Sequence, residues 1–119
     1  MNFAVIDDSQ RNRNGLYVYS HALITSDDEI FVVNYIGNNT NVFSQEDLLY
    51  EFIESNVPDE FNLYACTHYT KYNKIWDELV YCAANNKRVP RPVKKRFNMA
   101  DRISRQESKK TLENIIITI

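Results

Sequence analysis

Three strand-like segments follow one another in the first 36 residues, and short polar turns separate them. Residues 3–6 are apolar, residues 17–25 are β-branched and aromatic in parts, and residues 30–36 give the strongest strand signal of the chain. Runs of this kind, bounded by Asn, Asp, Ser and Gly, are typical of strands joined by hairpin turns. The first third therefore predicts three consecutive antiparallel strands, and the rest of the chain has to pack against them.

Helix and strand signals alternate in the middle of the chain. Apolar residues at helical spacing follow Ser44 and predict a helix that has Ser44 as its N-cap and ends near Asn56, before Pro58. Residues 61–66 predict a fourth strand. Apolar positions on one face then predict a second helix over residues 69–84.

The last third carries the opposite charge to the rest. Residues 1–86 hold 4 Lys/Arg and 13 Asp/Glu, a net charge of −9, whereas residues 87–119 hold 10 and 3, a net charge of +7. We expect residues 87–112 to be a basic segment that is partly helical after its prolines. Residues 114–119 are apolar and β-branched, and they predict a terminal strand.

These signals describe one small α/β domain. The 119 residues, 44% of them hydrophobic, suit a single core, with residues 1–86 as its acidic part. The predicted fold is a mixed sheet of about five strands in βββαβα(α)β order with helices packed on it. The sequence shows neither an apolar run of roughly 20 residues nor a signal peptide. Two cysteines are too few for a disulfide framework, which favours a cytoplasmic protein without a membrane partner.

Several short motifs along the chain have counterparts in one known protein family, which has the same core order of elements. The first strand of that family ends in an Asp followed by small residues, and residues 7–9, Asp-Asp-Ser, are similar. Its first helix carries an acidic residue before Leu, as Asp47 does here, with Glu46 as an alternative. Its C-terminal helix carries an Ala-Asp motif, which the stretch around Asp101 resembles. These motifs resemble those of the ribonuclease H-like family. The resemblance implies a nuclease site on Asp7, Asp47 and Asp101, with Asp7 and Asp47 as ligands of Mg²⁺ or Mn²⁺.

The chain departs from the family pattern in two places. The fourth strand of the family ends in Asp-Ser, and here Cys66 stands in place of that Asp. A thiolate is a soft ligand that suits Mg²⁺ poorly. The family also has a fifth strand before its C-terminal helix, where this sequence predicts none. The chain therefore resembles a degenerate member, with Asp7-Asp8 interpreted as a remnant or, alternatively, as the start of a turn.

Cys66 and His68 allow two further interpretations. They lie two residues apart and would share one face of an extended strand, which suits a Cys–His nucleophile pair or a soft-metal site completed by His21 or Cys82. The simpler interpretation is that Cys66 is a small buried hydrophobe, and that His21 is a surface or hydrogen-bonded polar residue.

The basic segment is the stronger functional candidate. Its cations are suited to neutralising phosphates, to docking on an acidic protein, or to holding the segment against the acidic core. The predicted function is binding of nucleic acid or an acidic protein surface without full two-metal catalysis. The alternatives are an active metal-dependent nuclease and a small viral or phage regulatory or inhibitor protein. The predicted binding residues are Lys87, Arg88, Arg91, Lys94, Lys95, Arg96, Arg102 and Arg105.

Overall fold

One mixed sheet forms the middle layer of the protein. The computed structural model describes residues 2–37, 45–83 and 89–118. The strands lie in the order β3-β2-β1-β4-β5. The first two pairs are antiparallel, whereas β4 runs parallel to both β1 and β5. The strands are β1 (Phe3–Arg13), β2 (Leu16–Thr25), β3 (Ile30–Gly37), β4 (Asn62–Ala65) and β5 (Val80–Ala83).

The first strand is longer than the sequence predicted. It continues past residues 3–6 to Arg13, so Asp7 and Asp8 lie within the strand and not at its end. The turn is made by Asn14 and Gly15, both with positive φ, 53° and 79°. Asn-Gly is the preferred dipeptide for such a two-residue hairpin, and it sets the register of everything that precedes it. The polar residues after Asp8 therefore pair with β2, where the prediction had a loop.

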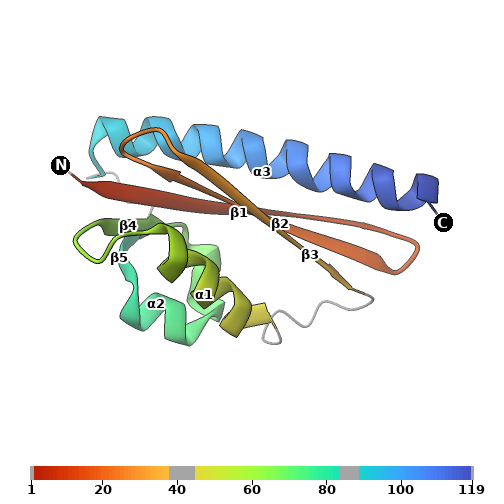
Figure 1. Ribbon diagram of the computed structural model, residues 1–119, viewed down its shortest axis with the longest axis horizontal. Helices are drawn as coiled ribbons and strands as arrows, with labels where there is room; N and C mark the ends of the chain where they lie inside the picture. Colours follow the sequence, from red (N-terminus) through yellow and green to blue (C-terminus); the bar gives the residue numbers. More distant parts are fainter. Residues whose placement is uncertain (1, 38–44, 84–88, 119) are drawn as a thin grey trace.

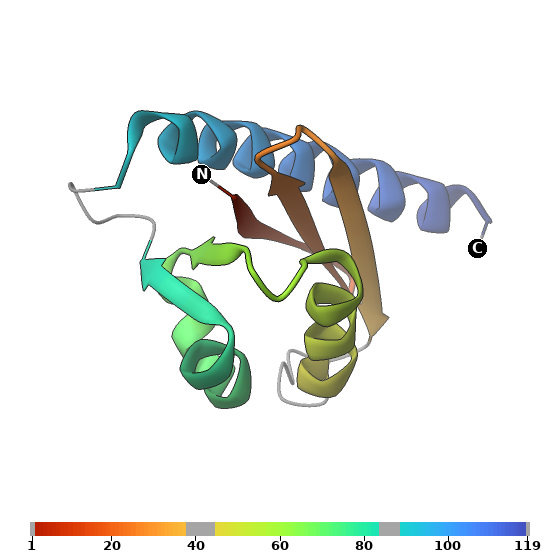
Figure 2. The ribbon, with the colours of Figure 1, turned by 60° about the vertical axis from the view of Figure 1, so that its left-hand side comes forward.

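Helices cover both faces of the sheet. The long helix α3 (Arg91–Thr118) lies along one face, and α1 (Glu46–Asn56) and α2 (Asn73–Glu78) lie on the other (Figures 1 and 2). Alternate residues of β1 serve the two layers, as the pleat requires. Ala4 and Ile6 pack in the core beneath α1 and α2, whereas Phe3 and Val5 pack in the core beneath α3.

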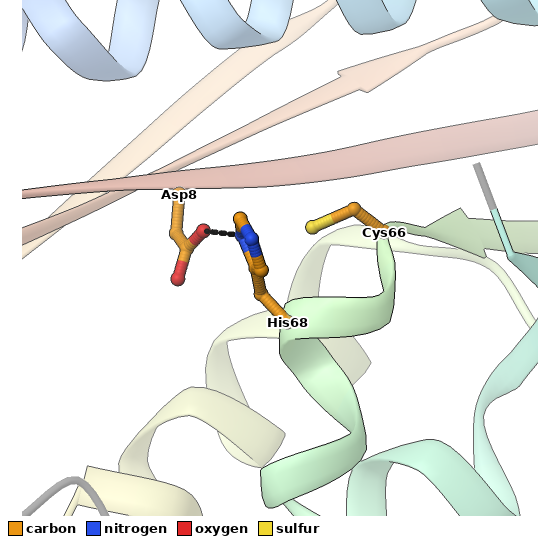
Figure 3. A group of neighbouring side chains, drawn as sticks. All are labelled: Asp8, Cys66 and His68. Carbon is orange, nitrogen blue, oxygen red and sulfur yellow. Dashed lines mark ion pairs between the residues drawn. The ribbon is translucent and has the colours of Figure 1, made fainter. Parts of the chain in front are cut away.

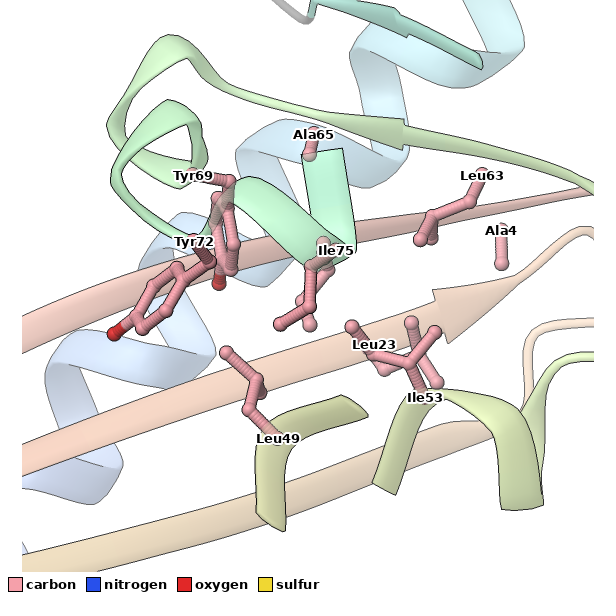
Figure 4. Close-up of a cluster of buried hydrophobic side chains, with 10 residues drawn as sticks. Ala4, Leu23, Leu49, Ile53, Leu63, Ala65, Tyr69, Tyr72 and Ile75 are labelled. Carbon is pink, nitrogen blue, oxygen red and sulfur yellow. The ribbon is translucent and has the colours of Figure 1, made fainter. Parts of the chain in front are cut away.

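The core on the α1 side is the larger of the two. It joins residues from β1, β2, β4 and the helices, and Figure 4 shows their side chains converging. Leu49 and Ile53, one turn apart on α1, are its buried contribution from that helix. The members are Ala4, Ile6, Leu23, Leu49, Ile53, Leu63, Ala65, Tyr69, Tyr72 and Ile75.

The second predicted helix, over residues 69–84, is wrong in its extent. The chain instead forms a 3₁₀ helix (Thr67–Lys71), then α2, and then β5, which pairs with β4. A short apolar run such as the one at residues 79–83 suits a buried strand as well as a helix, so periodicity could not separate the two. The predicted N-cap Ser44 lies outside the described residues, and the helix itself begins at Glu46.

The predicted terminal strand at 114–119 is also wrong, because α3 continues to Thr118. Adding residues to an existing helix costs little, and β-branched side chains lower helix propensity only slightly. Residue 119 lies outside the described residues. The prolines open this helix and do not hold the segment extended: the amides of Val93 and Lys94 both donate to the Pro90 carbonyl at 3.1 Å.

Arg96 fixes the start of α3 to the β2–β3 turn. Its side chain, 15% exposed, donates to the carbonyl oxygens of Thr25 and Ser26 at 3.1 Å. It also lies 3.2 Å from the Asp28 carboxylate and 5.1 Å from the centre of the Phe3 ring. The guanidinium therefore satisfies the Ser26 carbonyl and adds a second hydrogen bond to the Thr25 carbonyl, which also accepts the Asp28 amide at 2.9 Å.

Among the described residues, no helix combines the length and the apolar character needed to cross a membrane.

Candidate functional site

Polar side chains meet where β4 ends beside β1. The parallel register of these strands ends at the pair Ile6–Ala65, so the next residues, Asp7 and Cys66, come together. The Cys66 thiol donates to Asp7 Oδ1 at 3.6 Å. The next residue of β1, Asp8, points to the opposite face of the sheet because side chains alternate along a strand. The site therefore has a carboxylate on each face and a thiol at its edge.

Asp7 occupies the face that α3 covers. Its Oδ1 accepts a hydrogen bond from the Asp8 amide at 2.9 Å. Burial raises the pKa of Asp7 to about 6, and the charges of Asp8 and Asp101 add to that rise. Asp101, on α3, is therefore close enough to act on Asp7. Of the predicted catalytic residues, Asp7 therefore contacts Cys66, and Asp101 lies on the helix that covers the Asp7 face of the sheet.

Replacing Asp7 with asparagine is expected to stabilise the protein at pH 8 by about 1–2 kcal/mol. A carboxyl whose pKa is raised in the folded state contributes to the stability of the protein below its unfolded pKa. That contribution is lost as the pH rises through the folded pKa of about 6. The gain should be measurable by urea unfolding at pH 8 and absent at pH 4. Asp47→Asn, which removes an exposed carboxylate that does not act on Asp7, is the matched control and should give no gain.

The third predicted catalytic residue lies apart from this pair. Asp47 is exposed on the first turn of α1, and the described charges that act on Asp7 do not include it. Its neighbour Glu46 accepts a hydrogen bond from the Lys74 amide at 2.8 Å and so serves the start of α2. No contact among the described residues supports the predicted metal pair of Asp7 and Asp47.

Asp8 forms the centre of a second group of polar side chains. Its Oδ1 lies 3.5 Å from His68 Nδ1, and its Oδ2 lies 3.9 Å from Lys71 Nζ. One ligand atom from each of Asp8, Cys66 and His68 lies within 4.8 Å of the others. Figure 3 shows the three side chains and the ion pair between Asp8 and His68. A pocket of about 280 Å³ opens beside them, lined by Asp8, Ser9, Gln10, Tyr19, His68 and Lys71.

Cys66 is poorly placed to act as a nucleophile. Burial and the charge of Asp7 raise the pKa of the Cys66 thiol to about 12, so it stays protonated at neutral pH. Its hydrogen bond goes to Asp7, and the His68 ring pairs with Asp8. The hypothesis of a Cys–His nucleophile pair therefore finds no support in this geometry.

A buried histidine lies beneath Asp8. His21 faces Asp8 across the β1–β2 pair, is fully buried, and shares a hydrogen bond of 2.8 Å between its Nδ1 and the Tyr69 hydroxyl. Burial lowers the pKa of His21 to about 4, so the ring is neutral at pH 7. The rings of Tyr35 and Tyr72 pack against it edge to face. His21 therefore belongs to the core and is not a third ligand for Cys66 and His68.

The predicted basic residues within the described part of the chain separate into two groups, one held by the protein and one exposed. Arg96 is held by the β2–β3 turn, and Lys87 and Arg88 lie outside the described residues. The remaining five are exposed on α3, where Arg105 Nε also lies 3.2 Å from the Asp101 carboxylate. Exposed residues at alternating steps of four and three form one stripe along the helix, which we call the α3 stripe: Arg91, Lys95, Asn98, Arg102, Arg105 and Lys109.

The inner face of α3 changes character along its length. Val93, Phe97 and Ala100 pack in the apolar core near the start of the helix. Farther on, Ser104 and Ser108 are fully buried, and the Ser108 hydroxyl lies 3.3 Å from that of Ser9. These small residues let the helix lie close to the sheet, with its charged residues facing outward.

The sequence matches no protein-family model, and comparison with curated proteins finds no match. What the site does has to follow from its own geometry and chemistry.

Proposed function

We propose that this chain is a nucleic-acid-binding domain of the ribonuclease H-like kind that lacks a complete two-metal site. The observation that carries the proposal is the α3 stripe, which presents five cations on one exposed helix face. Arg91 and Lys109 are 18 residues apart, about 27 Å of helix. That length corresponds to about eight base pairs of a duplex, so the stripe can meet several phosphates at once.

The arrangement of elements supports the family resemblance. The sequence predicted no strand between the second helix and Asp101, which was a departure from the family. β5 lies between α2 and α3, and Asp101 lies on the C-terminal helix near Asp7. Cys66 still occupies the position of the missing carboxylate, and Asp47 lies apart. An oxygen-ligated Mg²⁺ pair therefore has too few ligands here.

The binding proposal predicts a strong dependence on salt. We expect binding of an RNA–DNA hybrid, followed by fluorescence anisotropy from 50 to 200 mM salt, to weaken steeply because phosphate contacts release counterions. Lys95→Gln, Arg102→Gln and Lys109→Gln together should lower the affinity at 100 mM salt by about 10–100-fold. The same variant should lower the slope of log affinity against log salt by about 2–3.

A matched variant removes three exposed cations elsewhere: Arg11→Gln, Arg13→Gln and Lys74→Gln. It has the same net charge as the stripe variant, and we expect less than about a threefold loss. Equal losses in the two variants would show that total charge matters and the stripe does not. If the unaltered chain fails to bind at 50 mM salt, the nucleic-acid proposal is wrong and an acidic protein becomes the partner to test.

The coupling of Asp7 and Asp101 favours one second candidate, an active nuclease that needs Mg²⁺ or Mn²⁺. Two carboxylates near one another are a minimal site for a hard cation. Cleavage of the same hybrid in Mn²⁺ that Asp7→Asn abolishes would establish this activity. Binding without cleavage would leave the domain as a binding module.

A further inference from the structure

The polar group on the far face from Asp7 contains three different kinds of ligand atom. Asp8 lies in β1, Cys66 directly follows the end of β4, and His68 lies in the 3₁₀ helix. Together they offer a carboxylate oxygen, a thiol sulfur and an imidazole nitrogen. The parallel pairing of β1 and β4 fixes the first two, and the extended backbone of Cys66 (φ −75°, ψ 167°) leads directly into the turn that carries His68.

The spacing of these atoms is close to that of ligands around one ion. In a tetrahedral zinc site, metal bonds of 2.0–2.3 Å place the ligand atoms roughly 3.3–3.6 Å from one another. Here the three atoms lie within 4.8 Å of each other, and Asp8 Oδ1 and His68 Nδ1 are already 3.5 Å apart. The His68 side chain is 72% exposed and can turn towards an ion without disturbing the core. The His68 nitrogen can therefore adjust its position to an ion that binds between the three atoms.

The ligand set selects the type of metal. Sulfur and imidazole suit borderline-soft ions such as Zn²⁺ and Co²⁺, whereas Mg²⁺ requires oxygen ligands. Asp7 Oδ1 lies 3.6 Å from Cys66 Sγ but belongs to the opposite face of the sheet, so the fourth coordination position is left to a solvent molecule. Lys71 is the competitor: its ammonium lies 3.9 Å from Asp8 Oδ2, where it partly takes the place of a cation.

We propose that Asp8, Cys66 and His68 bind a zinc-like divalent ion at the junction of β1 and β4, with one coordination position open to solvent. The site uses Asp8, which lies on the opposite face of the sheet from Asp7. It also uses Cys66, which stands where the family resemblance places an oxygen ligand. It needs neither the α3 stripe nor nucleic acid. Its test is therefore independent of the function proposed above.

Titration of the reduced protein with Co²⁺ tests the site directly. A cobalt–thiolate bond gives a near-ultraviolet charge-transfer band, and a four-coordinate ion gives intense visible bands. We expect both to saturate at one equivalent, to disappear when Zn²⁺ is added, and to be unaffected by millimolar Mg²⁺. Cys66→Ser should remove the charge-transfer band, and Cys82→Ser, which alters the chain's other cysteine, should leave it unchanged.

Two more variants keep the test decisive should Cys66→Ser fold poorly. His68→Ala alters an exposed side chain, and we expect it to weaken Co²⁺ binding at least about tenfold, as loss of ligand support does in metal sites. Lys71→Met should strengthen binding several-fold because it removes the competing ammonium. Absence of the thiolate band in the unaltered protein, or equal Co²⁺ affinity in the His68→Ala variant, would overturn the proposal.

Discussion

Replacing Arg96 with methionine is expected to lower the free energy of unfolding by about 2 kcal/mol. The side chain donates to the carbonyl oxygens of Thr25 and Ser26 from a position that is 15% exposed. Methionine keeps most of the apolar stem but leaves the Ser26 carbonyl without its charged donor, whereas the Thr25 carbonyl still accepts the Asp28 amide at 2.9 Å. Each unsatisfied buried group costs about 1–3 kcal/mol. Urea unfolding at pH 7 should show a lower midpoint with an unchanged slope.

The neighbouring residue provides the control for this prediction. Lys95→Met removes a cation from the exposed face of the same helix turn, and we expect a change within about 0.5 kcal/mol. Asp28→Asn should cost only a few tenths of a kcal/mol, because Asp28 is 68% exposed and its ion pair with Arg96 is screened. If Arg96→Met and Lys95→Met behave alike, Arg96 does not fix α3 to the turn.

The second large effect concerns acid. His21 is fully buried, and burial lowers its pKa from 6.5 to about 4, with a small opposing contribution from Asp8. A histidine whose folded pKa is lowered contributes stability above its unfolded pKa, and this is lost as the pH falls through about 4. The shift corresponds to about 3 kcal/mol between pH 6.5 and pH 4. Acid should therefore weaken the core around Tyr69.

Asp7 has to be removed from this measurement because it titrates in the same range with the opposite sign. In an Asp7→Asn background, we expect the free energy of unfolding to fall as the pH is lowered from 6.5 to 4.5. Adding His21→Asn, which keeps a polar side chain near the Tyr69 hydroxyl, should flatten that dependence while lowering stability at pH 7. Equal pH slopes in the two variants would show that His21 is not the group that titrates.

Much of the sheet could be predicted from local sequence. The runs at residues 17–25 and 30–36 are β-branched and aromatic, and both are strands. The conformation of residues 79–83 was harder to predict, because a run of four or five apolar residues shows neither helical nor strand periodicity. Pairing with β4 makes this run a strand. The end of α3 was missed for a related reason: a strand-like run of isoleucines continues a helix that is already formed.

The candidate site was predictable only in part. Family resemblance indicated Asp7 and Asp101, and residue type indicated Cys66 with His68. The partner of that pair was missed: His21 was considered as a ligand, but it is buried against Tyr69, and Asp8 lies beside the pair. The missing signal was the Asn14-Gly15 turn, whose register places Asp8 opposite His21 on the same face of the sheet, so that Asp8 lies beside His68 while His21 packs in the core.

The position of α3 has a consequence for protein synthesis. The β1–β2–β3 hairpins can pair as soon as Gly37 has left the ribosome, but the residues that cover their second face begin only at Val89. At 5–20 residues per second, the intervening stretch takes on the order of 3–10 s to translate. During that interval only Tyr64 of β4 can cover part of the apolar surface formed by Phe3, Val5, Ala22 and Ile24, so the nascent chain exposes a hydrophobic face that favours aggregation until α3 is made.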